Sequence, residues 1–378
     1  MIKIGFDAKR VFYNFTGLGN YCRTMILDLS DSFPDNEYHL FSPGVGNRVE
    51  SRPFFDNSRF HVHSAGRKLF KSIWRSFGMK RVLRKENIEL YHGLSNELPI
   101  GMRATGIKSV VTIHDLIFSR YPKQYDPLSV FAYSKKFKYA CEESDRIIAI
   151  SQSTKDDIIE TYGVKESKID VIYQSCNHIF DRRVGAIDRK RVAGRYGLPD
   201  SYLLYVGSII ERKRLLSIVR AVELIPEKER IPLVVIGKGG RYKRRIIDYI
   251  KSRQLTPWVV FVTDCRTQDL PAIYQQAEVF IYPSVYEGFG IPVIEALRSQ
   301  VPVITSDRSS LPEAGGPDSF QVNPDVPEEI AEAVRHILSN TDLRRKMISN
   351  GLEYSRKFMS SGIAQQVMDV YYRTLSSD

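Results

Sequence analysis

The sequence predicts an α/β protein made of two doubly wound domains, each with a parallel sheet covered by helices on both faces. Short and nearly continuous apolar runs alternate with longer segments of helical periodicity in the first half of the chain, and the second half repeats this alternation. Such apolar runs are typical of strands buried on both faces, and their alternation with helices favours parallel sheets. The length of 378 residues also fits two domains.

The strands and helices follow one another in two series. In the first half, strands are expected at Ile2–Phe6, Tyr38–Phe41, Arg59–Val62, Leu90–His92, Ser109–Ile113, Arg146–Ile150 and Ile169–Ile172, and helices at Asn20–Leu29, Lys68–Arg84, Pro127–Glu143 and Gln152–Tyr162. In the second half, strands are expected at Tyr202–Val206, Leu233–Ile236, Val259–Val262, Val279–Tyr282, Val301–Thr305 and Ser319–Val322. The helices of that half are expected at Arg214–Leu224, Tyr242–Arg253, Gln268–Gln276, Ile291–Arg298, Pro327–Leu338 and Asp342–Phe358. Two such series predict two Rossmann-like domains.

The domain boundaries follow from these series. We expect an N-terminal domain over residues 1–178, a linker over residues 179–200, a C-terminal domain over residues 201–360 and a terminal helix over residues 361–378. The linker is rich in Arg, Asp and Gly. A ligand of such a pair is expected at the carboxyl ends of the strands, in a cleft across which the two sheets face each other.

Composition narrows the class of protein. The net charge of +11 would suit a nucleic acid, a membrane surface or an anionic substrate. The four cysteines are not spaced as metal ligands or redox pairs, which predicts reduced thiols. Neither a signal peptide nor an apolar stretch of about 18 residues is found. We therefore expect a cytoplasmic globular protein.

The densest motif lies in residues 282–296 and contains Glu287, Gly288, Phe289, Gly290 and Glu295. A strand leads into a glycine-containing loop, and Pro292 stands where the first turn of a helix tolerates proline. Backbone N–H groups at this helix start would point at an anion, and the helix dipole favours negative charge there. The two carboxylates, taken alone, also fit helix capping and solvation. Because carboxylates accept hydrogen bonds from paired hydroxyls, the whole motif favours a nucleotide-linked sugar.

A second motif follows the strand Tyr202–Val206. Gly207 allows close approach of the backbone, and Arg212 and Lys213 offer two cations at the start of a helix. An exposed basic helix start is unfavourable against the helix dipole. This placement therefore favours an anionic ligand, such as a diphosphate.

These two motifs resemble those of the retaining glycosyltransferases of family 4, which have the GT-B fold. The Glu-x7-Glu spacing of Glu287 and Glu295 and the strand–Gly–Arg-Lys helix start carry the resemblance, which extends over essentially the whole chain. Among these enzymes, the chain is most similar to the mannosyltransferases of bacterial surface-polysaccharide assembly. The resemblance implies a metal-independent hexosyltransferase, and no Asp-x-Asp motif occurs in the chain.

The resemblance also assigns roles to residues of the second domain. It implies that Glu287 holds hydroxyls of the donor sugar, that Glu295 binds the ribose hydroxyls, and that Arg212 and Lys213 grip the diphosphate. Backbone groups of Gly288, Phe289 and Gly290 would contact the distal phosphate and the sugar, with Gly207 close by. Thr263, in Val262-Thr263-Asp264-Cys265, is expected near the nucleobase.

In the first domain, the resemblance assigns a loop and a histidine. Gly17-Leu18-Gly19 stands between the first strand and a helix, and in the family such a loop lies beside the donor diphosphate and the acceptor. His114, at the end of a strand, resembles the active-site histidine that contacts the donor sugar. A structural role is the alternative for His114. The segment Ser151-Gln-Ser-Thr-Lys155 resembles the family's Ser-x-x-Thr-Lys segment at a helix start, and helix capping by Ser151 or Ser153 explains it equally well.

A basic stretch from Arg67 to Lys85 contains no acidic residue. Leu69, Phe70, Ile73, Trp74 and Phe77 recur there at helical spacing. This stripe fits contact with the core, and it also fits a helix that lies on an anionic membrane surface. No nucleic-acid-binding motif accompanies it, so we expect no nucleic acid as partner.

The expected activity is transfer of a hexose from a nucleotide diphosphate sugar to a glycan or a lipid-linked glycan in surface-polysaccharide synthesis. GDP-mannose is the expected donor and a UDP-sugar the second candidate, with neither cofactor nor metal. The expected location is cytoplasmic, with peripheral association at the inner face of the membrane. A nucleotide-sugar epimerase or hydrolase of the same fold and a non-catalytic glycan-binding relative remain alternatives. The sequence leaves the acceptor and the oligomeric state open.

Overall fold

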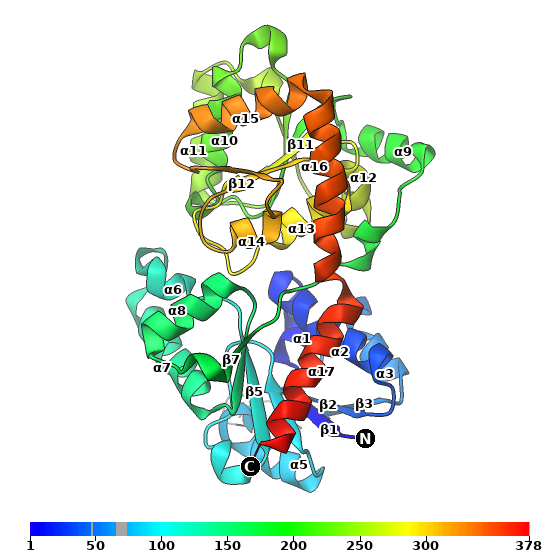
Figure 1. Ribbon diagram of the computed structural model, residues 1–378, viewed down its shortest axis with the longest axis vertical. Helices are drawn as coiled ribbons and strands as arrows, with labels where there is room; N and C mark the ends of the chain where they lie inside the picture. Colours follow the sequence, from blue (N-terminus) through cyan, green and yellow to red (C-terminus); the bar gives the residue numbers. More distant parts are fainter. Residues whose placement is uncertain (47, 66–73, 378) are drawn as a thin grey trace. The chain divides into compact units, whose positions relative to one another are not determined.

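The structure is a computed structural model that describes residues 1–46, 48–65 and 74–377. The chain divides into two compact units (Figure 1). Unit 1 comprises Met1–Ser175 together with Met359–Asp378, and unit 2 comprises Cys176–Phe358. Each unit is built around one parallel sheet.

Unit 1 contains a seven-stranded sheet with the order β3-β2-β1-β4-β5-β6-β7. Its strands are β1 (Lys3–Asp7), β2 (Glu37–Ser42), β3 (Phe60–Ser64), β4 (Leu90–Gly93), β5 (Lys108–Ile113), β6 (Arg146–Ala149) and β7 (Ile169–Val171). Its helices include α1 (Lys9–Tyr13), α2 (Gly17–Ser32), α3 (Pro53–Asp56), α5 (Met79–Lys85), α6 (Ile117–Arg120), α7 (Pro127–Glu143), α8 (Gln152–Tyr162) and α17 (Ser360–Ser376). All seven strands expected in the first half are present.

Unit 2 contains a six-stranded sheet with the order β10-β9-β8-β11-β12-β13. Its strands are β8 (Leu203–Val206), β9 (Leu233–Ile236), β10 (Val259–Val262), β11 (Val279–Tyr282), β12 (Val303–Ser306) and β13 (Phe320–Val322). Its helices include α9 (Ala186–Tyr196), α10 (Leu215–Leu224), α11 (Arg241–Ser252), α12 (Leu270–Tyr274), α13 (Ile291–Arg298), α14 (Leu311–Gly315), α15 (Pro327–Ser339) and α16 (Thr341–Tyr354). Both sheets have the doubly wound order that the alternating pattern predicts.

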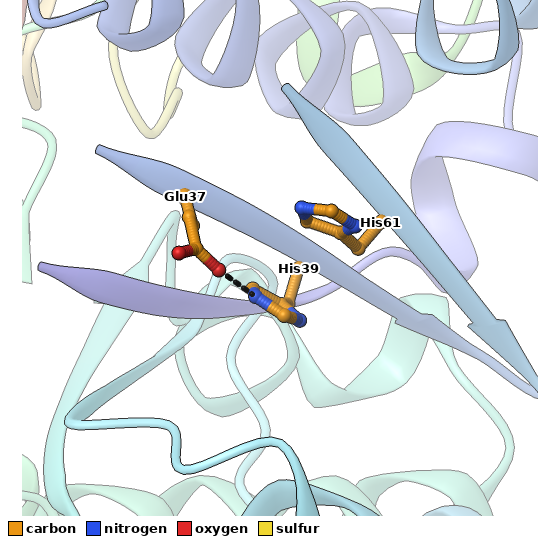
Figure 2. Close-up of side chains that lie close together, drawn as sticks. All are labelled: Glu37, His39 and His61. Carbon is orange, nitrogen blue, oxygen red and sulfur yellow. Dashed lines mark hydrogen bonds and ion pairs between the residues drawn. The ribbon is translucent and has the colours of Figure 1, made fainter. Parts of the chain in front are cut away.

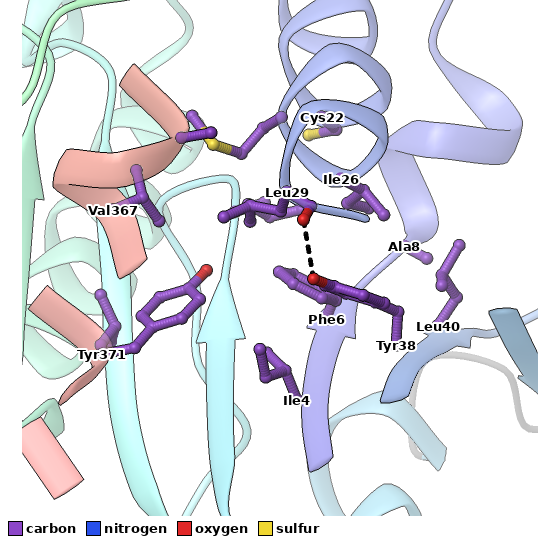
Figure 3. Packing of buried hydrophobic residues seen from close by; sticks show 14 of the residues in the cluster. Ile4, Phe6, Ala8, Cys22, Ile26, Leu29, Tyr38, Leu40, Val367 and Tyr371 are labelled. Atoms are coloured by element: carbon purple, nitrogen blue, oxygen red, sulfur yellow. Dashed lines mark hydrogen bonds between the residues drawn. The ribbon is translucent and has the colours of Figure 1, made fainter. Parts of the chain in front are cut away.

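The core of unit 1 shows why its strands are apolar on both faces. Phe6 and Tyr38 point to the face covered by α2 and α17, where Tyr38 donates a hydrogen bond to the carbonyl of Leu29 at 2.8 Å (Figure 3). Phe41 faces the other way and packs with Leu83 of α5. Alternate residues of one strand therefore enter two separate cores, as expected for a sheet covered on both sides.

The structure corrects two local expectations and favours one of two alternatives for a third. Residues 179–200 are not a linker, because α9 forms within them and the segment belongs to unit 2. Gly17-Leu18-Gly19 is not a loop but the first turn of α2, after Thr16 at the N-cap position. Ser151 is the N-cap of α8 and accepts a hydrogen bond from the N–H of Thr154 at 3.0 Å, which supports the capping interpretation.

The basic stretch is described only from Trp74 onward, so Leu69, Phe70 and Ile73 lie outside the described residues. Its described part forms a π-helical turn over Trp74–Gly78, followed by α5. Trp74, a residue of the predicted apolar stripe, packs against the core that contains Met79 and Leu83, which agrees with core contact at that position. Among the described residues, no helix combines the length and apolar character that crossing a membrane requires.

Candidate active site

The strand order of unit 2 changes direction between β8 and β11, which are neighbours in the sheet. Ligands of doubly wound sheets bind beside the carboxyl ends of the strands at such a point. Arg212 and Lys213 follow β8 in a short 3₁₀ turn, and Glu287 follows β11. Both sequence motifs of this domain therefore meet at the position where the fold favours a ligand.

Glu287 is a mostly buried carboxylate between two cations. Arg212 Nη1 and Lys213 Nζ each lie 3.0 Å from Glu287 Oε1, and the hydroxyl of Tyr282 donates to the same oxygen at 3.2 Å. Burial alone would raise the pKa of Glu287, but Lys213 and Arg212 hold this pKa below its usual value. Because two cations face one carboxylate, the cluster can stabilise a further negative charge, such as a phosphate.

The loop that carries Glu287 is fixed by two serines after β12. The hydroxyl of Ser309 accepts from the N–H of Glu287 at 3.1 Å and donates to its carbonyl at 2.6 Å. The hydroxyl of Ser310 donates to the carbonyl of Phe289 at 2.8 Å. These contacts hold the backbone of the motif in place before any ligand arrives. Sequence reasoning missed both serines, which lie 22 and 23 residues beyond Glu287.

Gly290 sets the direction of α13, which begins directly after it. Its φ of +123° is accessible to glycine, and a Cβ there would lie 2.9 Å from a methyl group of Leu311. The N-terminal turn of α13 thus follows the Glu287 loop and favours an anion there. The side chain of Phe289 is 2% exposed and packs edge-on against Phe358. A donor contact expected for Phe289 is thereby limited to its backbone.

Glu295 lies on α13 and has surroundings unlike those of Glu287. Its carboxylate accepts a hydrogen bond from the hydroxyl of Tyr274 at 3.0 Å. Burial raises the pKa of Glu295 to about 7, an effect that the Tyr274 hydrogen bond opposes. Hydroxyl groups of a ligand that donate to this carboxylate would stabilise its ionised form. Binding of paired hydroxyls would therefore accompany loss of the carboxyl proton.

Glycines bring the backbone after β8 close to the cation cluster. A Cβ on Gly207 would lie 3.2 Å from the ring of Tyr282 and 3.7 Å from Lys213 Cδ. A Cβ on Gly237, which follows β9, would lie only 1.9 Å from the carbonyl oxygen of Gly207. Gly237 therefore excludes a larger residue, whereas a Cβ on Gly207 would require the ring of Tyr282 to shift. Thr263 is exposed after β10, two strands away from β8 in the sheet.

In unit 1, His114 is 6% exposed and both of its ring nitrogens have partners. Its Nε2 donates to the carbonyl of Leu94 at 2.8 Å, and Gln174 donates to Nδ1 at 3.0 Å. Burial lowers the pKa of His114 to about 4, so the ring is neutral at neutral pH. A ligand that contacts Nδ1 has to replace Gln174, a partner that the sequence did not reveal.

A chain of buried polar groups connects the terminal helix with the surroundings of His114. The hydroxyl of Tyr371, on α17, lies 2.6 Å from His92 Nδ1, and His92 Nε2 lies 2.8 Å from Thr112 Oγ1. The same Thr112 oxygen lies 3.2 Å from the hydroxyl of Tyr21, whose ring packs edge-on against His114 with centroids 4.6 Å apart. This network connects α17 to His114 indirectly, through His92, Thr112 and Tyr21.

The two glycines at the start of α2 differ in their environment. A Cβ on Gly19 would lie 1.8 Å from the carbonyl oxygen of Asn14, so this position tolerates no side chain. The side chain of Asn14 accepts from the N–H of Gly19 at 3.1 Å and from the N–H of Thr16 at 2.9 Å. A Cβ on Gly17 would meet no atom within 4 Å. Gly19 is therefore required by packing, whereas Gly17 leaves open space at the helix start.

Unit 1 also contains a pocket of about 690 Å³ that the sequence did not identify. Its lining includes Lys9, Tyr13, Arg75, Lys135, Lys136 and Tyr139. Arg75 forms ion pairs with Asp7 and with Glu97, and Lys136 Nζ lies 3.7 Å from a carboxylate oxygen of Glu97. The pocket combines cations with aromatic walls, which suits a polar ligand that also has sugar or apolar surface.

Comparisons with known proteins agree with this architecture. Residues 16–178 match the family model described as Glycosyltransferase Family 4, and residues 188–354 match Glycosyl transferases group 1. The O-antigen chain mannosyltransferase B of Escherichia coli is 26% identical over 385 residues, covering 98% of this chain and 99% of that protein. The serotype-specific mannosyltransferase WbdA of Escherichia coli is 28% identical over 302 residues, covering 77% of this chain and 37% of WbdA.

Solved structures give the same fold. The crystal structure of Anabaena HepE in complex with UDP-glucose superposes with a TM-score of 0.75 at 16% identity, covering 99% of this chain and 100% of HepE. The two family models, over residues 16–178 and 188–354, show that the chain belongs to glycosyltransferase family 4, and the structural likeness shows the GT-B fold. The protein is a glycosyltransferase.

Proposed function

We propose that this enzyme transfers mannose from GDP-mannose to a glycan or a lipid-linked glycan during synthesis of a surface polysaccharide, with retention at the anomeric carbon. The observation that carries the proposal is the mostly buried Glu287 between Arg212 and Lys213, at the point between β8 and β11 where the strand order changes direction. The mannosyltransferase names of the two Escherichia coli relatives support mannose as the sugar. These relatives are transferases, which gives the epimerase and hydrolase alternatives no support.

In the proposed donor complex, the diphosphate binds Arg212, Lys213 and the N-terminal turn of α13. Glu287 accepts hydrogen bonds from hydroxyls of the sugar, because its lowered pKa keeps it ionised. Glu295 accepts hydrogen bonds from the two ribose hydroxyls, and Thr263 lies toward the nucleobase. The role of His114 in binding the sugar stays a prediction, and a ligand at its Nδ1 requires Gln174 to release this nitrogen.

The proposed reaction is a front-face transfer. The acceptor hydroxyl attacks the anomeric carbon as the bond to the diphosphate breaks, and the departing phosphate oxygen takes the acceptor proton. Charge accumulates on the leaving diphosphate, where the cations and the α13 amides stabilise it. The protein contributes by positioning the reactants and by providing charges that are already in place.

We place the acceptor in the pocket of unit 1. Lys9 and Lys135 supply positive charge, and Tyr13 and Tyr139 supply ring faces on which sugars can stack. The exposed Arg81, Arg84 and Lys85 of α5 suit contact with anionic lipid at the inner face of the membrane. This would bring the enzyme to a lipid-linked acceptor.

A panel of nucleotide sugars tests the donor. The protein is mixed separately with GDP-mannose, UDP-glucose, UDP-galactose and GDP, and both thermal stabilisation and nucleotide release are measured. GDP-mannose should raise the melting temperature most and release GDP slowly without acceptor. A UDP-sugar that stabilises more strongly would replace mannose in the proposal, and an isomerised sugar in the products would indicate an epimerase.

A further inference from the structure

Three histidines and a glutamate share one face of the outer strand pair of unit 1. Glu37 and His39 lie two residues apart on β2, and His61 and His63 lie two residues apart on the edge strand β3. Residues two apart on a strand point to the same face, and His39 is directly opposite His61 in the register of the two strands. The pairing of two strands therefore gathers four possible metal ligands at one place.

The donor atoms are close together before any ion is present. Glu37 Oε2 lies 3.3 Å from His39 Nε2, and a ligand atom of His61 lies within 4.8 Å of both groups (Figure 2). Zinc bonds of 2.0–2.2 Å in a tetrahedron separate ligand atoms by roughly 3.3 Å. The pair of ligands on β2 already has this spacing. His61 is exposed, so its ring is free to rotate toward the other two.

His39 has a partner for its second nitrogen. Its Nδ1 lies 3.0 Å from His63 Nε2, and the two rings are parallel within 2°. A metal-bound histidine usually donates its other N–H to a nearby acceptor, which fixes the ring and its tautomer. His63 can accept that hydrogen bond, while Phe41 stacks on His63 at 4.7 Å and limits its rotation.

Two features compete with a metal. Lys3 Nζ lies 3.1 Å from Glu37 Oε2, although both side chains are about one-third exposed, and such ion pairs contribute little. The contacts also fit a hydrogen-bonded row without metal, in which His63 donates to His39 and His39 donates to Glu37. The row does not involve His61, which stands beside His39 with ring centroids 4.6 Å apart. The role of His61 therefore separates the two interpretations.

We propose that Glu37, His39 and His61 form a binding site for a divalent transition metal of the zinc class, with His63 orienting His39. Two imidazoles and one carboxylate are a typical zinc ligand set, with a fourth position left for water. Binding requires His39 to carry its proton on Nδ1 and His63 to accept its hydrogen bond at Nε2. The two neutral rings reach these tautomers by proton exchange with water, so no net proton is released. The ion would join the edge strand β3 to β2. This site is separate from the donor groups of unit 2, and the proposal does not depend on the donor.

Zinc uptake by the full chain tests the site. The protein is stripped with a chelator, dialysed and titrated with Zn²⁺ in competition with a chromogenic chelator. We expect one equivalent to bind, and His61→Asn and Glu37→Gln each to weaken binding at least about 100-fold, more than the 10-fold to 100-fold expected for His63→Gln. His61→Asn changes an exposed side chain, so its fold should be retained, which circular dichroism checks.

Two matched variants show where any zinc binds. His178→Asn removes an exposed histidine outside the cluster, and Cys265→Ser removes a partly exposed thiol, so both should bind zinc like the unaltered protein. A cobalt-substituted sample should show the visible bands of tetrahedral nitrogen and oxygen ligation without a thiolate charge-transfer band. Absence of zinc uptake, unaltered affinity in His61→Asn, or loss of binding in Cys265→Ser would each overturn the proposal. So would a loss in Glu86→Gln together with unaltered binding in Glu37→Gln, because His39, His63 and Glu86 also lie within ligand distance of one another.

Discussion

Replacement of Lys213 by methionine probes the cation cluster most sharply. Methionine keeps most of the apolar length of the side chain, which packs over the ring of Tyr282 with Nζ 4.7 Å from its centroid. It removes the charge that lies 3.0 Å from Glu287 Oε1. Arg212 remains at the same distance from that oxygen, so Glu287 keeps one partner.

The expected magnitudes follow from these distances. At an effective dielectric constant of about 20, unit charges at this separation attract by about 5 kcal/mol. Desolvation, the main cause of the lowered pKa of Lys213, offsets much of this attraction. We expect the free energy of unfolding to fall by about 3 kcal/mol, as for a broken buried ion pair. If Lys213 also stabilises the leaving diphosphate, turnover should fall about 100-fold to 1000-fold.

The assay measures both quantities on the same samples. Urea denaturation followed by circular dichroism gives the free energy of unfolding, and nucleotide release with saturating donor gives turnover. Lys228→Met is the matched control, because Lys228 is exposed and precedes β9, at the end of the strands opposite the site. Turnover of Lys213→Met within twofold of the unaltered enzyme would refute the assignment of Lys213 to the diphosphate.

Three further predictions concern other parts of the site. Because Glu295 has a pKa raised to about 7, its folded form binds a proton more tightly than the unfolded chain; its contribution to stability is complete below the unfolded value and is lost as pH rises through 7. Ribose binding needs the carboxylate, so calorimetry should show that nucleotide affinity rises from pH 6 to pH 8 in the unaltered enzyme and stays constant in Glu295→Gln. The same rise with pH in Glu295→Gln as in the unaltered enzyme would reject the ribose role. Gly290→Ala should lower the free energy of unfolding by about 2 kcal/mol, because alanine disfavours a φ of +123°, and an unchanged urea midpoint would contradict this. Tyr371→Phe should cost about 1–3 kcal/mol in urea denaturation, because it leaves a buried nitrogen of His92 without its hydroxyl partner, and a neutral effect would remove Tyr371 from the network.

The strands were predictable because each carries its own signal. Apolar runs buried on both faces stand out locally, as in Val279–Tyr282, and their alternation with helical periodicity indicates the doubly wound order. Local boundaries were less accurate. The first turn of α2 contains two glycines, which favour a loop by propensity, yet Asn14 fixes this turn by accepting from the N–H of Gly19. This local side-chain contact supports a helical turn where the glycines favour a loop.

The chemistry of the site was predictable only where its residues are adjacent in sequence. The spacing of Glu287 and Glu295 and the pair Arg212-Lys213 identified the main groups. Their supporting partners come from distant segments, as Ser309 does for Glu287 and Gln174 for His114. Polar residues such as these are common at strand ends, so nothing in the sequence marks the contact. The opposite pKa shifts of the two glutamates likewise depend on neighbours that folding brings together.

The central claim is that Glu287 holds the donor sugar while the adjacent cations hold the diphosphate. Glu287→Gln tests it most directly, by calorimetry with GDP and by turnover of GDP-mannose, since it removes the carboxylate but keeps Arg212 and Lys213. The account predicts that GDP binds at least as tightly as to the unaltered enzyme, whereas turnover falls at least about 100-fold, or about 2.7 kcal/mol. Unchanged turnover, or a loss of GDP affinity as large as the loss of turnover in a variant with the native circular dichroism spectrum, would contradict it.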